Sequence, residues 1–140
     1  MSYLIGFTIA LLVAAFARFS GFDRDRSFYP TVVVVIALYY VLFAAMGGSA
    51  RALVLESIMM TVFAALAVAG FKGSLWLVVA ALAGHGVMDL FHAQIVENPG
   101  VPEWWPGFCA AADVGLALAL AWVIKVAAPA AYAPHLPEVR

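Results

Sequence analysis

Five apolar stretches, each close to the length that a helix needs to cross a lipid bilayer, divide the chain from end to end. A membrane-spanning α-helix takes about 20 mostly apolar residues, because the hydrocarbon core is about 30 Å thick. Hydrophobic residues make up 66% of the 140 positions and charged residues only 11%, whereas a soluble domain is about a quarter charged. The sequence therefore predicts an all-α, polytopic membrane protein, a compact bundle of five transmembrane helices.

Turn-forming residues between these stretches set the expected helix bounds. Pro30 suits the first turn of a helix, Ser74 suits an N-cap position, and the segments 47–49 (GGS) and 98–100 (NPG) break the chain into loops. Short connections favour antiparallel neighbours in an up-down bundle. We expect one transmembrane domain over residues 1–128 and a proline-rich cytoplasmic tail over 129–140. The expected helices cover residues 2–19, 30–46, 50–70, 74–96 and 106–127.

The basic residues predict the orientation of the bundle. Cytoplasmic loops of membrane proteins carry an excess of Lys and Arg. Arg51 is the one basic residue expected on one side, where Glu97 and Glu103 also lie. The amino terminus is therefore expected outside and the carboxyl terminus inside. The six basic residues expected on the inner side are Arg18, Arg24, Arg26, Lys72, Lys125 and Arg140.

Net charge and cysteine content narrow the range of partners. The net charge of −1 indicates no nucleic-acid partner and no polybasic lipid-binding surface, so membrane lipids are the expected surroundings. The single cysteine, Cys109, excludes an internal disulfide and is expected to pack in the bundle. A chain this small is expected to form a homo-oligomer.

Three ionisable residues share one face of the fourth expected helix. His85, Asp89 and His92 are spaced by four and then three residues, which places them within about 40° of one another. Each ionisable side chain at the centre of a bilayer helix costs at least about 2.5 kcal/mol on insertion scales. Such a stripe indicates a buried polar site in the membrane.

Two further carboxylates are expected at the same depth. The helical rise puts Asp89 and Asp113 about 10 Å, and Glu56 about 8 to 9 Å, below the outer ends of their helices. All three therefore fall in one layer in the outer half of the bilayer. We expect these side chains to meet there.

Two imidazoles and three carboxylates suit a divalent metal ion such as zinc, iron or manganese. The predicted ligands are His85, Asp89 and His92, and Asp89-x-x-His92 has the spacing of di-metal pairs in helical bundles. Glu56 and Asp113 are the predicted catalytic residues, as a further ligand or as the base that activates a metal-bound water. The residues predicted to line an apolar substrate pocket are Tyr39, Tyr40, Phe63 and Phe91.

The favoured hypothesis is a metal-dependent enzyme, a hydrolase or an oxidoreductase, that acts on a lipophilic substrate. One alternative is a proton-relay or small-ion transport protein, although residues 73–84 of the fourth helix contain no ionisable side chain. Another alternative is a structural or accessory subunit, in which His85 hydrogen-bonds Asp113 or Glu56 to hold helices together. In that case Glu56 could pair with Arg51, and Gly84 and Gly86 would permit close helix approach.

Six short segments carry a resemblance to known proteins: 27–31 (SFYPT), 37–40 (ALYY), 55–57 (LES), 85–89 (HGVMD), 98–102 (NPGVP) and 104–106 (WWP). Together they resemble a group of small uncharacterised bacterial integral membrane proteins with five helices, which implies the bacterial inner membrane. A looser resemblance is to the alkaline-ceramidase type of intramembrane zinc hydrolase, which also combines Glu, Ser, Asp and His on helices. This chain has Glu56, Ser57 and His85, but five expected helices in place of seven and no late His-x-x-x-His pair.

Overall fold

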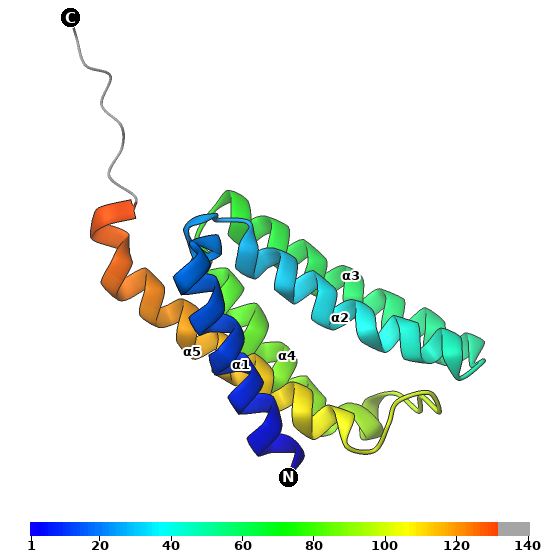
Figure 1. The fold of residues 1–140 in the computed structure, drawn as a ribbon. Helices are drawn as coiled ribbons and strands as arrows, with labels where there is room; N and C mark the ends of the chain where they lie inside the picture. Colours follow the sequence, from blue (N-terminus) through cyan, green and yellow to red (C-terminus); the bar gives the residue numbers. More distant parts are fainter. Residues whose placement is uncertain (132–140) are drawn as a thin grey trace, which may run out of the picture.

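The computed structural model describes residues 1–131. Over that range the chain is helical and contains no strand, which confirms the predicted all-α class (Figure 1). All five α-helices of the described residues are long and apolar enough to cross a membrane. Residues 132–140 of the predicted tail lie outside the described residues. The elements are α1 (Ser2–Ser20), the 3₁₀ helix η1 (Phe22–Arg24), α2 (Phe28–Met46), α3 (Ala50–Lys72), α4 (Leu75–Ile95) and α5 (Trp105–Ala131).

The helix starts follow from the capping residues in the sequence. The Ser74 side chain accepts a hydrogen bond from the Trp76 amide (3.4 Å), and Ser49 accepts one from the Ala52 amide (3.2 Å). These bonds satisfy amides that have no partner within the first helical turn. Pro30 lies in the first turn of α2, where its missing N–H costs no helical hydrogen bond. The predicted N-cap at Ser74 is thus confirmed.

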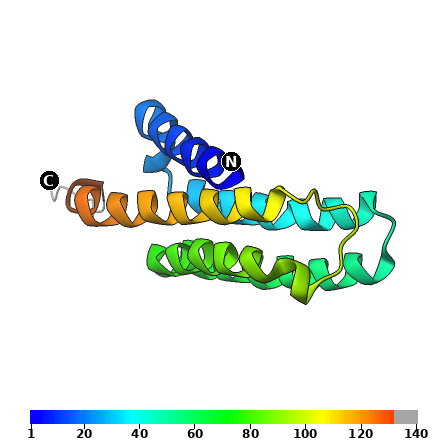
Figure 2. The same ribbon diagram turned by 90° about the horizontal axis from the view of Figure 1, so that it is seen from below.

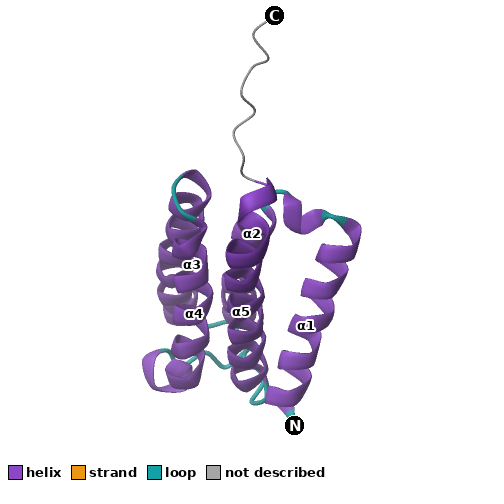
Figure 3. Cartoon of the chain, turned by 90° about the vertical axis from the view of Figure 1, so that its left-hand side faces the viewer, coloured by secondary structure: helices purple, strands orange, loops and turns teal. Residues whose placement is uncertain are grey.

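α4 lies at the centre of the packing and contacts α2, α3 and α5. Figure 2 shows α3 and α4 in one layer, α2 and α5 in the next, and α1 outside them. Successive helices run in opposite directions (Figure 1). However, α1 packs along α5 and not along α2, its neighbour in sequence. Figure 3 shows α1 at one edge of the bundle. The connection between α1 and α2, which includes η1, is long enough that the two helices need not pack against each other.

Small residues let α1 and α5 approach closely. A Cβ atom on Gly115 would lie only 2.7 Å from the Cβ of Ala10, and one on Gly6 would overlap the backbone carbonyl of Phe108. Close backbone approach at glycine and alanine is a common way for helices to associate where no water drives the packing. α1 buries Gly6, Ala10 and Ala17 and little else, so its attachment depends on these positions.

Arg26 ties the connection before α2 to the carboxyl-terminal end of α3. Its guanidinium donates hydrogen bonds to the carbonyl oxygens of Phe71 (2.6 Å), Gly70 (3.3 Å) and Gly73. The last carbonyls of a helix have no partner within the helix. Arg26 therefore caps α3 and holds the α2–α3 pair at this end.

Replacing Gly115 by leucine is expected to separate α1 from α5. The added side chain meets Ala10 and Phe7 at van der Waals overlap, and overpacking of this kind costs about 1–3 kcal/mol. We expect Gly115→Leu to lower the free energy of unfolding in detergent micelles by that amount. The matched control is Gly84→Leu, because no atom lies within 4 Å of a Cβ at Gly84. Equal stability of the two variants would contradict the close α1–α5 contact.

Candidate metal centre

Four side chains from α4 and α5 form a buried group with the spacing of a metal site, which we call the central cluster. One ligand atom from each residue lies within 4.8 Å of every other. All four side chains are nearly closed to the surface, with at most 3% exposure. The central cluster consists of His85, Asp89, Cys109 and Asp113.

Two carboxylates share one imidazole nitrogen in this cluster. His85 Nδ1 lies 2.7 Å from Asp113 Oδ2 and 3.5 Å from Asp89 Oδ2. Asp89 Oδ2 and Asp113 Oδ1 accept no hydrogen bond from any described residue. Each carboxylate has one partner through its other oxygen, but a buried oxygen without a donor still costs about 1–3 kcal/mol. The site therefore has capacity for a cation or for additional protons.

Gly86 allows α4 and α5 to come close enough for this contact. A Cβ atom at Gly86 would lie 3.0 Å from the carbonyl oxygen of Ala110 and 3.2 Å from the Cβ of Asp113. A larger side chain would push Asp113 away from His85. Gly84, the other glycine beside His85, has open space around it. Gly86 is therefore the glycine that allows α4 and α5 to approach closely.

A second buried group, the loop cluster, joins α3, the end of α4 and the loop before α5. It consists of Glu56, His92 and Asn98. Glu56 Oε1 lies 2.7 Å from His92 Nε2 and accepts a hydrogen bond from Asn98 Nδ2 at 2.9 Å. Glu56 is only 1% exposed, and its carboxylate contacts His92 and not Arg51. The predicted alternative pairing with Arg51 is therefore absent from the described residues.

Tyr40 on α2 connects the two clusters. Its hydroxyl donates a hydrogen bond to Asp89 Oδ1 (2.7 Å), and its ring stacks on His92 with a centroid separation of 4.2 Å. Its backbone carbonyl accepts a hydrogen bond from Asn98 Nδ2 (3.1 Å). On the other side of the central cluster, Phe63 packs edge-to-face on His85 at 4.7 Å. Tyr40 thus contacts both groups, while Phe63 contacts the central cluster.

The structure divides the predicted metal and catalytic residues between these two groups. Asp113 joins His85 and Asp89, whereas His92 and Glu56 pair with each other. His92 lies seven residues beyond His85, about 10 Å along the helix, and its Nε2 is 2.7 Å from Glu56 Oε1, so it stands outside the group of four mutually close ligands. Asn98 was not among the predicted site residues, because a loop Asn before Pro-Gly reads as a turn signal.

Cys109 belongs to the central cluster, although the sequence analysis favoured a packing role for it. Its Sγ is one of the four mutually close ligand atoms. The signal in the sequence was its position four residues before Asp113, which puts both side chains on one face of a helix. A thiol near two carboxylates and an imidazole adds a soft ligand to the set.

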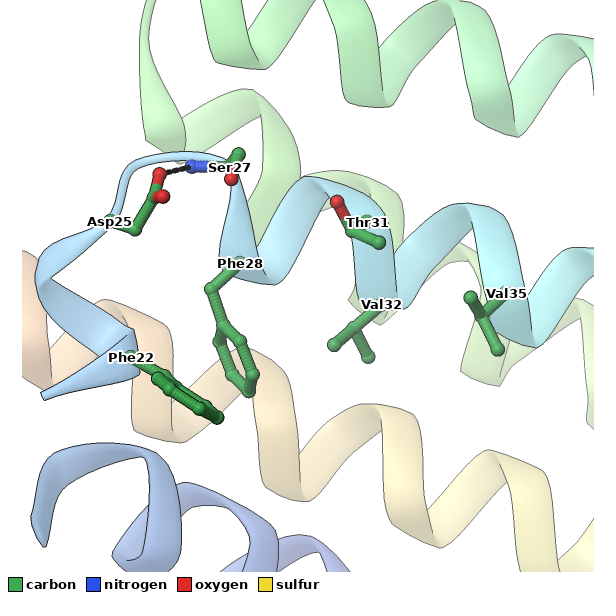
Figure 4. A pocket seen from close by; sticks show the side chains of 7 residues that line it. All are labelled: Phe22, Asp25, Ser27, Phe28, Thr31, Val32 and Val35. Atoms are coloured by element: carbon green, nitrogen blue, oxygen red, sulfur yellow. Dashed lines mark hydrogen bonds between the residues drawn. The ribbon is translucent and has the colours of Figure 1, made fainter. Parts of the chain in front are cut away.

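Two of the four predicted pocket residues lie away from the clusters. Tyr39 is 40% exposed and packs on Trp105, and Phe91 is 55% exposed. The structure instead has an apolar cleft of about 350 Å³ beside η1 and the start of α2 (Figure 4). Within it the Ser27 amide donates a hydrogen bond to the Asp25 carboxylate (2.8 Å), which lowers the pKa of Asp25. The cleft is lined by Phe22, Asp25, Ser27, Phe28, Thr31, Val32 and Val35, none of which belongs to either cluster.

Comparison with protein-family models, curated proteins and solved structures finds no match. Any proposal about function therefore rests on the chemistry of the two clusters.

Removing the Tyr40 hydroxyl is expected to destabilise the protein. Tyr40→Phe leaves Asp89 Oδ1 buried without its donor, and the loss of such a bond costs about 1 kcal/mol. We expect the free energy of unfolding in micelles to fall by that amount. Tyr39→Phe is the matched control, since Tyr39 is exposed, and it should change stability by less than about 0.5 kcal/mol. An unaffected Tyr40→Phe variant would show that the Tyr40–Asp89 bond contributes nothing.

Proposed function

We propose that the chain is a multi-pass membrane protein that binds a divalent first-row transition-metal ion at the central cluster. One observation carries this proposal. Two buried carboxylates, each with an oxygen that accepts no hydrogen bond from the described residues, converge with a thiol on one imidazole. A divalent cation would neutralise these carboxylates in surroundings that cannot solvate them.

The ligand types suit such an ion, and small shifts of the side chains would bring them to its ligand spacing. Zinc binds nitrogen, sulfur and carboxylate oxygen at about 2.0–2.3 Å, so tetrahedral ligands lie about 3.3–3.8 Å apart. The 3.5 Å separation of His85 and Asp89 falls in that range, and the 2.7 Å contact of His85 with Asp113 would open by about 1 Å. The thiol favours zinc or iron over manganese, because manganese prefers oxygen ligands.

The proposed role of the metal is in a hydrolytic or oxidative reaction on a lipophilic substrate. A metal ion of this kind polarises a bound carbonyl or activates water. Tyr40, 2.7 Å from Asp89, and Glu56 beyond it supply groups that exchange protons near the metal. The lipid-compatible surface of the bundle and the loose resemblance to intramembrane zinc hydrolases support a lipophilic substrate.

A proton relay is the second candidate, favoured by one observation. Asp113, His85, Asp89 and Tyr40 form a series of polar contacts, with separations of 2.7, 3.5 and 2.7 Å, of which the first and the last are hydrogen bonds. Such a series can pass a proton between side chains. The absence of ionisable residues from positions 73–84 counts against a path that continues through the bundle. Metal content distinguishes the two candidates.

The proposed orientation places the loop cluster toward the outside of the cell. Arg18, Arg24 and Lys72 lie at the opposite end of the helices from Arg51 and Glu97, and basic ends face the cytoplasm. The resemblance to small bacterial membrane proteins supports the bacterial inner membrane as the location. Homo-oligomerisation is part of the same proposal.

Metal analysis tests the central cluster directly. Elemental mass spectrometry on tag-free protein in detergent should find about one zinc or iron per chain. His85→Ala and Asp113→Ala should lose it, because each removes a ligand, while His92→Ala should retain it. Metal-free wild-type protein, even after incubation with zinc or iron, would reject the metal site and favour the relay. Loss of metal from His92→Ala alone would instead reject the proposed ligand set.

Thiol labelling tests the orientation. In a Cys109→Ser background, Glu103→Cys should react with a membrane-impermeant maleimide on intact cells, and Arg24→Cys should react only after the membrane is opened. The reason is that positive loops are retained in the cytoplasm. The reverse labelling pattern would place the amino terminus inside.

A further inference from the structure

A polar cavity of about 530 Å³ lies where the α2–α3 turn meets the loop between α4 and α5. Its wall includes the hydroxyl of Ser49, the charged groups of Arg51 and Glu97, and the amide of Gln94. The opposite charges of Arg51 and Glu97 offset each other. The remaining residues of the wall are Ala52, Leu55, Ala93, Ile95 and Pro99.

The residues of the loop cluster come from the same three chain segments that form the wall of this cavity. Glu56 follows Leu55 of the wall, and His92 precedes Ala93 of the wall. Asn98 stands between Glu97 and Pro99, which both line the cavity. All three cluster side chains are buried. The loop cluster is therefore a buried polar layer next to the cavity, and none of its three residues lines the cavity itself.

Polar contacts continue from this layer to the central cluster. The ring of Tyr40 stacks on His92, and its hydroxyl reaches Asp89. Along α4, His92 and Asp89 are one turn apart and His85 follows after another, a total of about 10 Å. A cation that left the cavity would meet a carboxylate or an imidazole at each turn of α4.

The apolar cleft at the other end of the bundle is less suited to admit a cation. The apolar cleft beside η1 is lined by aromatic and aliphatic side chains, with Asp25 as its one ionisable residue among the described positions. Between that end and His85, residues 73–84 of the chain contain no ionisable side chain. An unsolvated cation in such surroundings has a prohibitive cost. The polar layer at Glu56 and His92 is the favoured side for access.

We propose that Glu56 and His92 form a transit site for divalent cations, through which a metal ion passes from the polar cavity to the central cluster. This inference rests on the proposed metal-binding function. Glu56 supplies a carboxylate and His92 an imidazole, both ligands of zinc and cobalt. Passage breaks the side-chain bonds of Glu56 to His92 and Asn98 and leaves the backbone hydrogen bonds of the helices intact. Loss of the transit site therefore slows loading and leaves final occupancy unchanged.

The test measures Co²⁺ uptake by the full chain in detergent micelles, stopped with a chelator at timed intervals and followed by metal counting. Glu56→Gln and His92→Gln should lower the initial rate at least tenfold, while the final occupancy and the Kd change less than threefold. Ser57→Ala is the matched control, because the Ser57 hydroxyl bonds only within α3, to the Leu53 carbonyl. Its uptake rate should remain within twofold of the wild type.

Blocking the cavity provides a second measurement that leaves the loop cluster and the Ser49 cap of α3 in place. Gln94→Cys, in the wall of the cavity, modified with a bulky maleimide should slow Co²⁺ uptake at least tenfold. Thr31→Cys, modified in the same way in the apolar cleft, should load at the wild-type rate.

Three results would overturn the transit site. If Glu56→Gln and the blocked Gln94→Cys protein both bind metal at the wild-type rate, the transit site is rejected and the metal centre stands. Reduced final occupancy in Glu56→Gln would make Glu56 a ligand or a structural residue of the metal centre itself. A wild-type protein that takes up no Co²⁺ would remove both the transit site and the proposed function.

Discussion

The contact of His85 with Asp113 and Asp89 constrains the rest of this structure. Each of these groups lies inside an apolar bundle with at most 2% exposure, and each would be costly there alone. Their partners must therefore come from neighbouring helices. Gly86 permits the close approach of α4 and α5, Tyr40 supplies a hydroxyl from α2, and the packing places α4 at the centre.

The two buried clusters differ in how fully their polar groups are paired. In the loop cluster, one oxygen of Glu56 accepts bonds from both His92 and Asn98, which is the arrangement of a satisfied polar network. In the central cluster, an oxygen of Asp89 and one of Asp113 accept no hydrogen bond from the described residues. Incomplete pairing in a buried site is typical of a place that holds a ligand or changes protonation. This contrast is why the proposed metal ion is assigned to the central cluster.

Much of the fold could be predicted from the sequence, because the thickness of a bilayer sets the length of a helix that spans it. The apolar stretches predicted the helices to within a few residues, and the cap at Ser74 followed from local chemistry. The packing partner of α1 could not be predicted, because short loops suggest that helices adjacent in sequence pack together. Here small residues at Gly6 and Ala10 direct α1 onto α5, a long-range choice that no local pattern encodes.

For the site, the sequence by itself determined which polar residues occur within the apolar helices and that His85 and Asp89 share a helical face. Those conclusions need only helical periodicity and the cost of burying charge. The tertiary structure decided that Asp113 and Cys109 join them, while His92 pairs with Glu56 and Asn98. The reason is physical: which side chains meet across helices depends on rotation and separation of the helix axes. Those quantities are set by side-chain packing along the whole interface, here by the close approach at Gly86.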